Sequence, residues 1–175
     1  MTNILSHITV LELAGGVAGP SAAQTLGDFG ARVMKVEPPS GDPVRHWPGP
    51  RLECGDSAAF LALNRNKESV VLDLASGSGR SAVRSLAVKA DIIVADDDLG
   101  PTGLDYSSLH PDNPGLVYAL IDPTLPDGTK GRDALHQAAS GYGAINGMPE
   151  GPPAKAGLPM ICLLYTSDAA DDWFC

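Results

Sequence analysis

The residues most able to do chemistry surround a glycine-rich turn near the start of the chain. An apolar, β-branched run at residues 8–13 leads into Ala14, Gly16 and Gly19. These three stand at the spacing of a dinucleotide-binding fingerprint, with alanine in place of its first glycine. Glu37 closes the next apolar run, at about the distance from which such sites hold a ribose hydroxyl. Free N–H groups at a helix start also bind phosphate, so one hypothesis is a nicotinamide-dependent oxidoreductase.

A structural interpretation of the same turn stays open. Glycines after a first strand are common in parallel α/β proteins, because they let the following helix approach the strand closely. The first fingerprint glycine is absent, and Pro20 lacks an N–H group at the predicted helix start. The turn alone is therefore a weak signal for nicotinamide or flavin binding.

The elements that position this turn alternate between strand and helix patterns. We expect strands at residues 8–13, 31–37, 70–74, 91–95 and 116–121. A first helix should begin at Pro20 and end before Gly30, and a second helical stripe covers 79–89. Long loops are expected at 38–55 and 123–132. This alternation predicts an α/β fold with a Rossmann-like parallel sheet, helices on both faces and the glycine turn at its carboxyl edge.

Composition narrows the class of protein. The net charge is −9, from 12 basic and 21 acidic residues, and no basic cluster offsets it, so nucleic acid and anionic membrane surfaces are unsuitable partners. The three cysteines fit neither a zinc site nor a disulfide framework, and no metal site is expected. The start of the chain lacks a signal-peptide pattern, and no apolar run is long enough to span a membrane. We expect a cytoplasmic protein.

A series of short motifs is more distinctive in its order and spacing than any one of its members. The motifs lie at residues 10–13, 18–20, 26–31, 33–37, 40–45, 64–67, 69–74, 90–94, 113–118, 137–141 and 151–153. From about Leu5 to about Pro159, this series resembles the opening of the class III CoA-transferases. That family includes formyl-CoA transferase, carnitine CoA-transferase and the related α-methylacyl-CoA racemase.

The resemblance implies a CoA-binding domain, an interlocked homodimer and CoA transfer between carboxylic acids, or racemisation of an acyl-CoA. In the transferases an aspartate attacks the thioester, and an enzyme-bound acyl intermediate follows. Coenzyme A and acyl-CoA would be substrates, the acceptor would be a carboxylic acid, and no cofactor would be permanently bound. The CoA-contacting residues that the resemblance implies are Val17, Ala18, Pro38, Leu72, Asp73, Leu74, Ala75, Asp96 and Lys130.

The chain departs from the family pattern near its end. Counting from residues 151–153, Cys162 stands where the catalytic aspartate belongs, and only His136 is a candidate base for it. The alternative is that the register is broken there, because residues 162–175 resemble translated sequencing-adapter DNA. We therefore expect residues 1–161 to be the N-terminal part of a family III domain, 162–175 to be a non-native tail, and the chain as given to be inactive.

Two further departures affect the CoA site. Asp96, Asp97 and Asp98 follow the fourth strand where the family has an asparagine and a phenylalanine, so they either repel the pyrophosphate or form a solvated turn. Pro38 replaces an arginine of formyl-CoA transferase, whereas Lys130 matches a lysine that reaches the CoA phosphates. These departures favour a second hypothesis, a non-catalytic half that pairs with an active domain.

Overall fold

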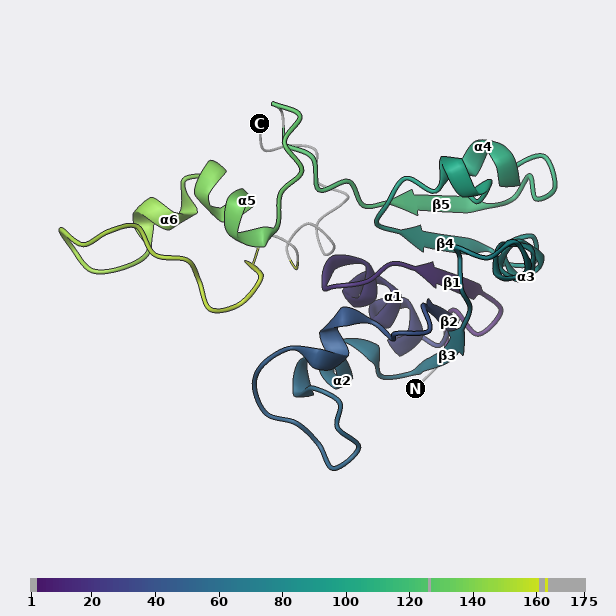
Figure 1. Ribbon diagram of the computed structural model, residues 1–175, viewed down its shortest axis with the longest axis horizontal. Coiled ribbons are helices and arrows are strands. Elements are labelled where there is room, and N and C mark those ends of the chain that lie inside the picture. Colours follow the sequence, from purple (N-terminus) through teal and green to yellow (C-terminus); the bar gives the residue numbers. More distant parts are fainter. Residues whose placement is uncertain (1–2, 126, 161–162, 164–175) are drawn as a thin grey trace. The chain divides into compact units, whose positions relative to one another are not determined.

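The computed structural model describes residues 3–125, 127–160 and 163. The chain forms two compact units, Met1–Ile121 and Asp122–Cys175. The first unit contains a five-stranded sheet made of β1 (Thr9–Leu13), β2 (Arg32–Glu37), β3 (Lys67–Val71), β4 (Ile92–Ala95) and β5 (Val117–Leu120). Every pairing in it is parallel and the strand order is β3-β2-β1-β4-β5 (Figure 1). The predicted parallel α/β fold is confirmed.

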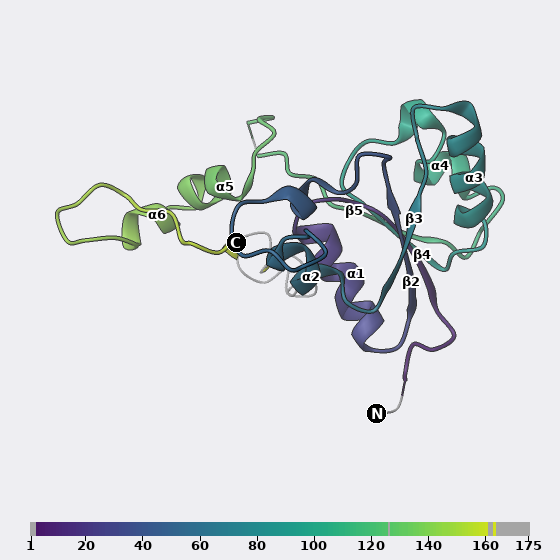
Figure 2. The ribbon, with the colours of Figure 1, turned by 60° about the horizontal axis from the view of Figure 1, so that its bottom comes forward.

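Helices cover both faces of this sheet. The first unit holds α1 (Ala18–Asp28), α2 (Ala58–Asn64), α3 (Gly77–Ala87), α4 (Tyr106–Leu109) and two short 3-10 helices, η1 (Pro43–His46) and η2 (Gly100–Thr102). Figure 2 shows α1 and α2 on one face and α3 and α4 on the other. The second unit contains α5 (Asp133–Ala139) and α6 (Tyr142–Ile145). No helix among the described residues is both long and apolar enough to cross a membrane.

Strand alternation divides the apolar residues of the first unit between two cores. Val10 and Val33 pack with Ala23 of α1 on one face. Leu11 packs with Val83 of α3 on the other. Successive side chains of a strand point to opposite faces, so strands that are apolar throughout, such as β4, require this double cover.

The third strand lies earlier than predicted. It spans Lys67–Val71 rather than residues 70–74, and Lys67 pairs with Val33 at its first position. The chain turns away at Asp73, whose carboxylate accepts a hydrogen bond from Ala75 N at 2.9 Å. This local turn takes the place of further pairing with β2, because the Asp73 side chain bonds the backbone within the turn. The apolar pattern of residues 72–74 therefore did not indicate a strand.

The glycine turn sits at the carboxyl end of β1, as predicted, and α1 begins two residues before Pro20. Gly16 has a φ of 69°, which favours glycine. A Cβ atom on Gly19 would lie 2.3 Å from Ala14 Cβ, far inside van der Waals contact. The structural interpretation of Gly19 is therefore confirmed: it lets α1 pack against the end of β1.

Candidate functional site

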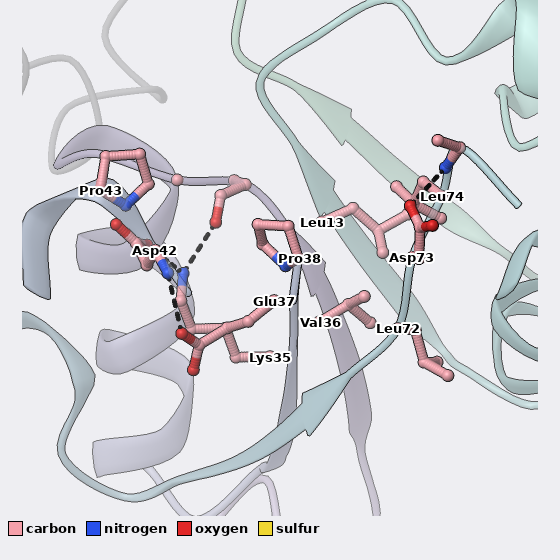
Figure 3. A pocket seen from close by; sticks show the side chains of 13 residues that line it. Leu13, Lys35, Val36, Glu37, Pro38, Asp42, Pro43, Leu72, Asp73 and Leu74 are labelled. Carbon is pink, nitrogen blue, oxygen red and sulfur yellow. Dashed lines mark hydrogen bonds and ion pairs between the residues drawn. The ribbon is translucent and has the colours of Figure 1, made fainter. Parts of the chain in front are cut away.

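A cavity of about 310 Å³ opens at the carboxyl ends of β1, β2 and β3 (Figure 3). It is lined by Leu13, Ala14, Gly15, Lys35, Val36, Glu37, Pro38, Asp42, Pro43, Leu72, Asp73, Leu74 and Ala75. Ligands of open α/β sheets bind outside the carboxyl ends of the strands, so the cavity lies where the fold class places a binding site.

Five of the residues predicted to contact CoA meet in this cavity. They are Pro38, Leu72, Asp73, Leu74 and Ala75, from the end of β2 and from the β3–α3 loop. Their lining of one cavity agrees with the predicted site, and their contact with CoA stays a prediction.

The β3–α3 loop is held by the first turns of α3. Ser76 caps this helix by accepting a hydrogen bond from Gly79 N at 3.0 Å. Arg80 Nη1 donates to the carbonyl oxygens of Leu74 and Ala75, at 2.9 and 2.8 Å. These bonds fix the backbone of one cavity wall, so the wall is preorganised for a ligand.

A chain of buried charges supports the floor of the cavity and the glycine turn. Lys35 Nζ lies 2.8 Å from Glu12 Oε1 and 2.8 Å from Asp42 Oδ2, and it also donates to the carbonyl of Ala14. Lys67 Nζ lies 2.7 Å from Glu12 Oε2 and donates to the carbonyl of Pro20. All four ionic side chains are at most 2% exposed. The two ammonium groups therefore anchor the backbone on both sides of the glycine turn.

The two buried lysines differ electrostatically. Burial acts to lower the pKa of both ammonium groups. At Lys35 the carboxylates of Glu12 and Asp42 outweigh burial, so its pKa is raised above the usual value. At Lys67 burial prevails over the attraction of Glu12, and its pKa is lowered. Lys35 is consequently the more strongly protonated of the two lysines in this buried ionic network.

Both carboxylate oxygens of Glu37 accept two hydrogen bonds each from residues of the first unit. Arg45 Nη2 donates to Oε1 and Arg45 Nε to Oε2, each at 2.7 Å. Ser69 Oγ donates to Oε1 at 2.7 Å and Asp42 N to Oε2 at 3.0 Å. Arg45 itself lies over the ring of Phe60, 3.8 Å from its centre. Glu37 thus fixes the loop after β2, and its oxygens are occupied rather than presented to a ribose.

The Arg45 side chain, followed by the Ser69 and backbone bonds, lowers the pKa of Glu37 from 4.5 to about 2. A carboxyl group whose pKa falls on folding stabilises the fold above its ordinary pKa and loses that contribution as pH falls through its folded pKa. We expect wild-type stability to drop between about pH 4.5 and pH 2, and Glu37→Gln to flatten the drop. Thermal melts across this range test it, with Glu68→Gln in the exposed pair with Arg32 as control. Equal slopes for wild type and Glu37→Gln would contradict the assignment.

The aspartates after β4 accept hydrogen bonds from different parts of the chain. The half-buried Asp96 accepts a hydrogen bond from Gly15 N at 2.8 Å, and burial raises its pKa. The exposed Asp98 instead accepts from Gly100 N at 2.9 Å within its own turn. Asp98 thus belongs to an exposed turn, as one of the two interpretations has it, whereas Asp96 contacts Gly15 of the cavity lining. The repulsion of a pyrophosphate by Asp96 stays a prediction.

Three other residues predicted to contact CoA are not among those that line the cavity. Val17 and Ala18 form the start of α1, where no side chain caps the helix. Lys130 is an exposed residue of the second unit, in an isolated bridge with Thr124. Their roles in CoA binding stay predictions. Cys162, the predicted catalytic residue, lies outside the described residues.

His136, the candidate base, is also in the second unit. Its Nε2 lies 3.1 Å from the carbonyl oxygen of Pro123. No group of three or more His, Cys, Asp or Glu that could hold a metal ion occurs in the described part of the chain. The charged groups that line the cavity are the ion-paired side chains of Lys35, Glu37 and Asp42 and the exposed carboxylate of Asp73.

Residues 5–167 match CoA-transferase family III. The chain belongs to this family. The match runs past the predicted boundary at residue 161, and the assignment of 162–175 as a non-native tail stays a prediction.

Curated relatives of the family III chain are named as transferases. It is 43% identical, over 167 residues, to succinate–glutarate CoA-transferase of Agrobacterium fabrum, covering 88% of this chain and 42% of that protein. It is 37% identical to succinyl-CoA–D-citramalate CoA-transferase of Chloroflexus aurantiacus, covering 95% and 43%. It is 35% identical to succinyl-CoA:glutarate CoA-transferase of Mus musculus, covering 91% and 38%. The chain thus spans less than half the length of these relatives.

Solved structures of the family agree with the fold. A CaiB/BaiF family protein from Brucella suis superimposes with a TM-score of 0.87 at 36% identity, covering 97% of this family III chain and 48% of that one. The Mycobacterium tuberculosis protein Rv3272 gives a TM-score of 0.83 at 30% identity, covering 94% and 48%. The family III chain therefore has the same α/β fold as these proteins over nearly its whole length.

Proposed function

We propose that this chain is the CoA-binding part of an enzyme that moves CoA between carboxylic acids through an enzyme-bound acyl intermediate. The observation that carries the proposal is the cavity at the carboxyl edge, where Pro38 and residues 72–75 come together. Relatives whose names include succinate or succinyl-CoA support a short dicarboxylic acid as acyl group or acceptor. CoA acts here as a substrate, with no permanently bound cofactor, and we propose a cytoplasmic homodimer.

In this proposal the first unit binds and orients CoA, and the acyl chemistry takes place beyond the cavity. The rigid β3–α3 wall and the anchored glycine turn hold one end of the molecule. The uncapped start of α1 offers N–H groups towards an anion, because the first N–H groups of a helix have no partner within it.

A non-catalytic CoA-transferase-like half is the second candidate. The Asp96 carboxylate beside Gly15 favours it, since a negative charge at the turn weakens the binding of a phosphate. The nicotinamide hypothesis is disfavoured, because Glu37 makes four hydrogen bonds within the protein and offers no open acceptor to a ribose.

Calorimetric titration of the 175-residue chain with CoA and with NADH separates the CoA-binding proposal from the nicotinamide hypothesis. We expect CoA to bind and NADH to give no heat of binding. Binding of NADH alone would contradict the proposal and restore the oxidoreductase hypothesis.

We also expect the chain by itself to show no transfer of CoA from succinyl-CoA to glutarate, since it lacks a nucleophilic aspartate at position 162. Turnover that disappears in Cys162→Ala would overturn this expectation and make Cys162 the nucleophile.

A further inference from the structure

Lys67 ends the sequence motif at residues 64–67, to which the proposed function gives no role. It is the first residue of β3, and its side chain is 2% exposed. Its ammonium lies 2.7 Å from Glu12 Oε2. It also donates to the carbonyl of Pro20 at 2.8 Å and to Asn64 Oδ1 at 2.9 Å. An ammonium group has three N–H donors, so three acceptors surround a group that can serve three.

Through these contacts Lys67 acts on both sides of the glycine turn. After the turn it bonds directly to Pro20, in the first turn of α1. Before the turn it acts through Glu12, whose other carboxylate oxygen accepts from Lys35 at 2.8 Å. Lys35 in turn donates to the carbonyl of Ala14 at 2.8 Å. Loss of the Lys67 ammonium would therefore disturb the backbone at both ends of the turn.

Lys67 also balances the charge of the buried network. Lys35 and Lys67 are the cations, and Glu12 and Asp42 are the anions. Two of these four residues, Lys35 and Asp42, line the carboxyl-edge cavity. Without Lys67 the network would carry an uncompensated negative charge beside the cavity, and this charge would repel an anionic ligand.

We infer that Lys67 is a positioning residue for the proposed CoA site: it holds the glycine turn and the start of α1 in place without lining the cavity itself. The inference rests on the proposed CoA binding. The residues that connect Lys67 to the ligand are Ala14 and Gly15, which belong both to the turn and to the cavity lining. The motif at residues 64–67 thus serves the site from the opposite end of β3.

Lys67→Met tests the inference, because methionine keeps an unbranched apolar side chain and removes the ammonium. Calorimetric titration of the full chain at low salt should show roughly three- to tenfold weaker binding of CoA than in the wild type. Hydrogen–deuterium exchange without CoA should also accelerate at residues 14–21. We expect this acceleration to be at least about threefold greater than that at residues 77–81, in the first turn of α3.

Val83→Ala is the control for loss of stability alone. Val83 is fully buried in the core on the other face of the sheet, so the substitution leaves a cavity far from the glycine turn. It should destabilise the protein and leave the affinity for CoA unchanged. It should not accelerate exchange at residues 14–21 above that at residues 77–81.

The Glu12→Gln, Lys67→Met double variant separates positioning from stability. It leaves Lys35 and Asp42 as a balanced pair, so no buried charge of the network lacks a partner, and it should be more stable than Lys67→Met. The carbonyl of Pro20 still lacks its donor, so CoA should still bind more weakly than in the wild type, and exchange at residues 14–21 should stay fast.

Two results would overturn the inference while leaving CoA binding itself intact. One is an unchanged affinity in Lys67→Met. The other is full recovery of both affinity and exchange together with stability in the double variant, because Lys67 would then act only by stabilising the fold. Absence of CoA binding by the wild type would instead refute the proposed function together with the inference.

Discussion

Lys35→Met should lower the free energy of unfolding by about 3–5 kcal/mol, because it removes one partner from a buried ionic network. Glu12 would keep only Lys67, and Asp42 Oδ2 would lose its cation while its side chain remains 2% exposed. The carbonyl of Ala14 would also lose its donor. Urea denaturation followed by circular dichroism measures the loss.

Arg32→Met is the matched control for that measurement. Arg32 lies on the same strand and pairs with Glu68, but its side chain is 60% exposed, and exposed pairs contribute little. Its substitution should shift the denaturation midpoint far less. Equal shifts for the two variants would show that Lys35 does not hold a buried network.

Asp96→Asn should tighten CoA binding three- to tenfold at low salt. Asparagine can still accept the hydrogen bond from Gly15 N, while the negative charge beside the turn is gone. Because burial raises the pKa of Asp96, acidification protonates the wild-type carboxyl more readily than an exposed one. The advantage of the variant over the wild type should therefore narrow as pH falls and as salt is added.

Titration calorimetry on both proteins at several pH values makes this comparison, with Asp98→Asn as control. Asp98 accepts from Gly100 N in an exposed turn, so its substitution should change the affinity little. An equal gain from Asp98→Asn would mean that the acidic loop acts through general charge rather than through the contact of Asp96 with Gly15.

Periodicity was sufficient to predict β1, β2, β4, β5, α1 and α3, because helices cover both faces of the parallel sheet, but it did not predict the short helices α2 and α4. Of the central strands of the sheet, β4 is apolar throughout, and β1 and β2 are rich in Val, Leu and Met. Gly30, with a φ of 101°, follows the first helical segment where the sequence placed it. The third strand was misplaced because its first residues, Lys67 and Glu68, are charged. Lys67 is nevertheless buried through Glu12, and Glu68 pairs with Arg32 across the sheet. The charged residues at its start therefore do not indicate a strand in the sequence, because the side chains that pair with them are distant in the chain.

The residues of the candidate site that belong to sequence motifs could be predicted. The contacts that depend on how neighbouring strands are aligned in the sheet could not. The motif residues 72–75 and Pro38 meet in the cavity. The pairing of Glu12 with Lys35, 23 residues away, arises only because the two stand side by side in adjacent strands. In the folded protein Arg45 and Ser69 donate hydrogen bonds to Glu37. Sequence spacing alone predicts instead that Glu37 binds a ribose.

Hydrogen–deuterium exchange of the 175-residue chain with and without CoA tests most directly whether the carboxyl-edge cavity is a CoA site. We expect CoA to slow exchange in peptides that contain Leu13–Gly15, Pro38 and Leu72–Ala75, and to leave the amino edge of the sheet around Asp91 unchanged. Protection confined to other segments, or no protection at a CoA concentration that saturates the calorimetric signal, would contradict the account.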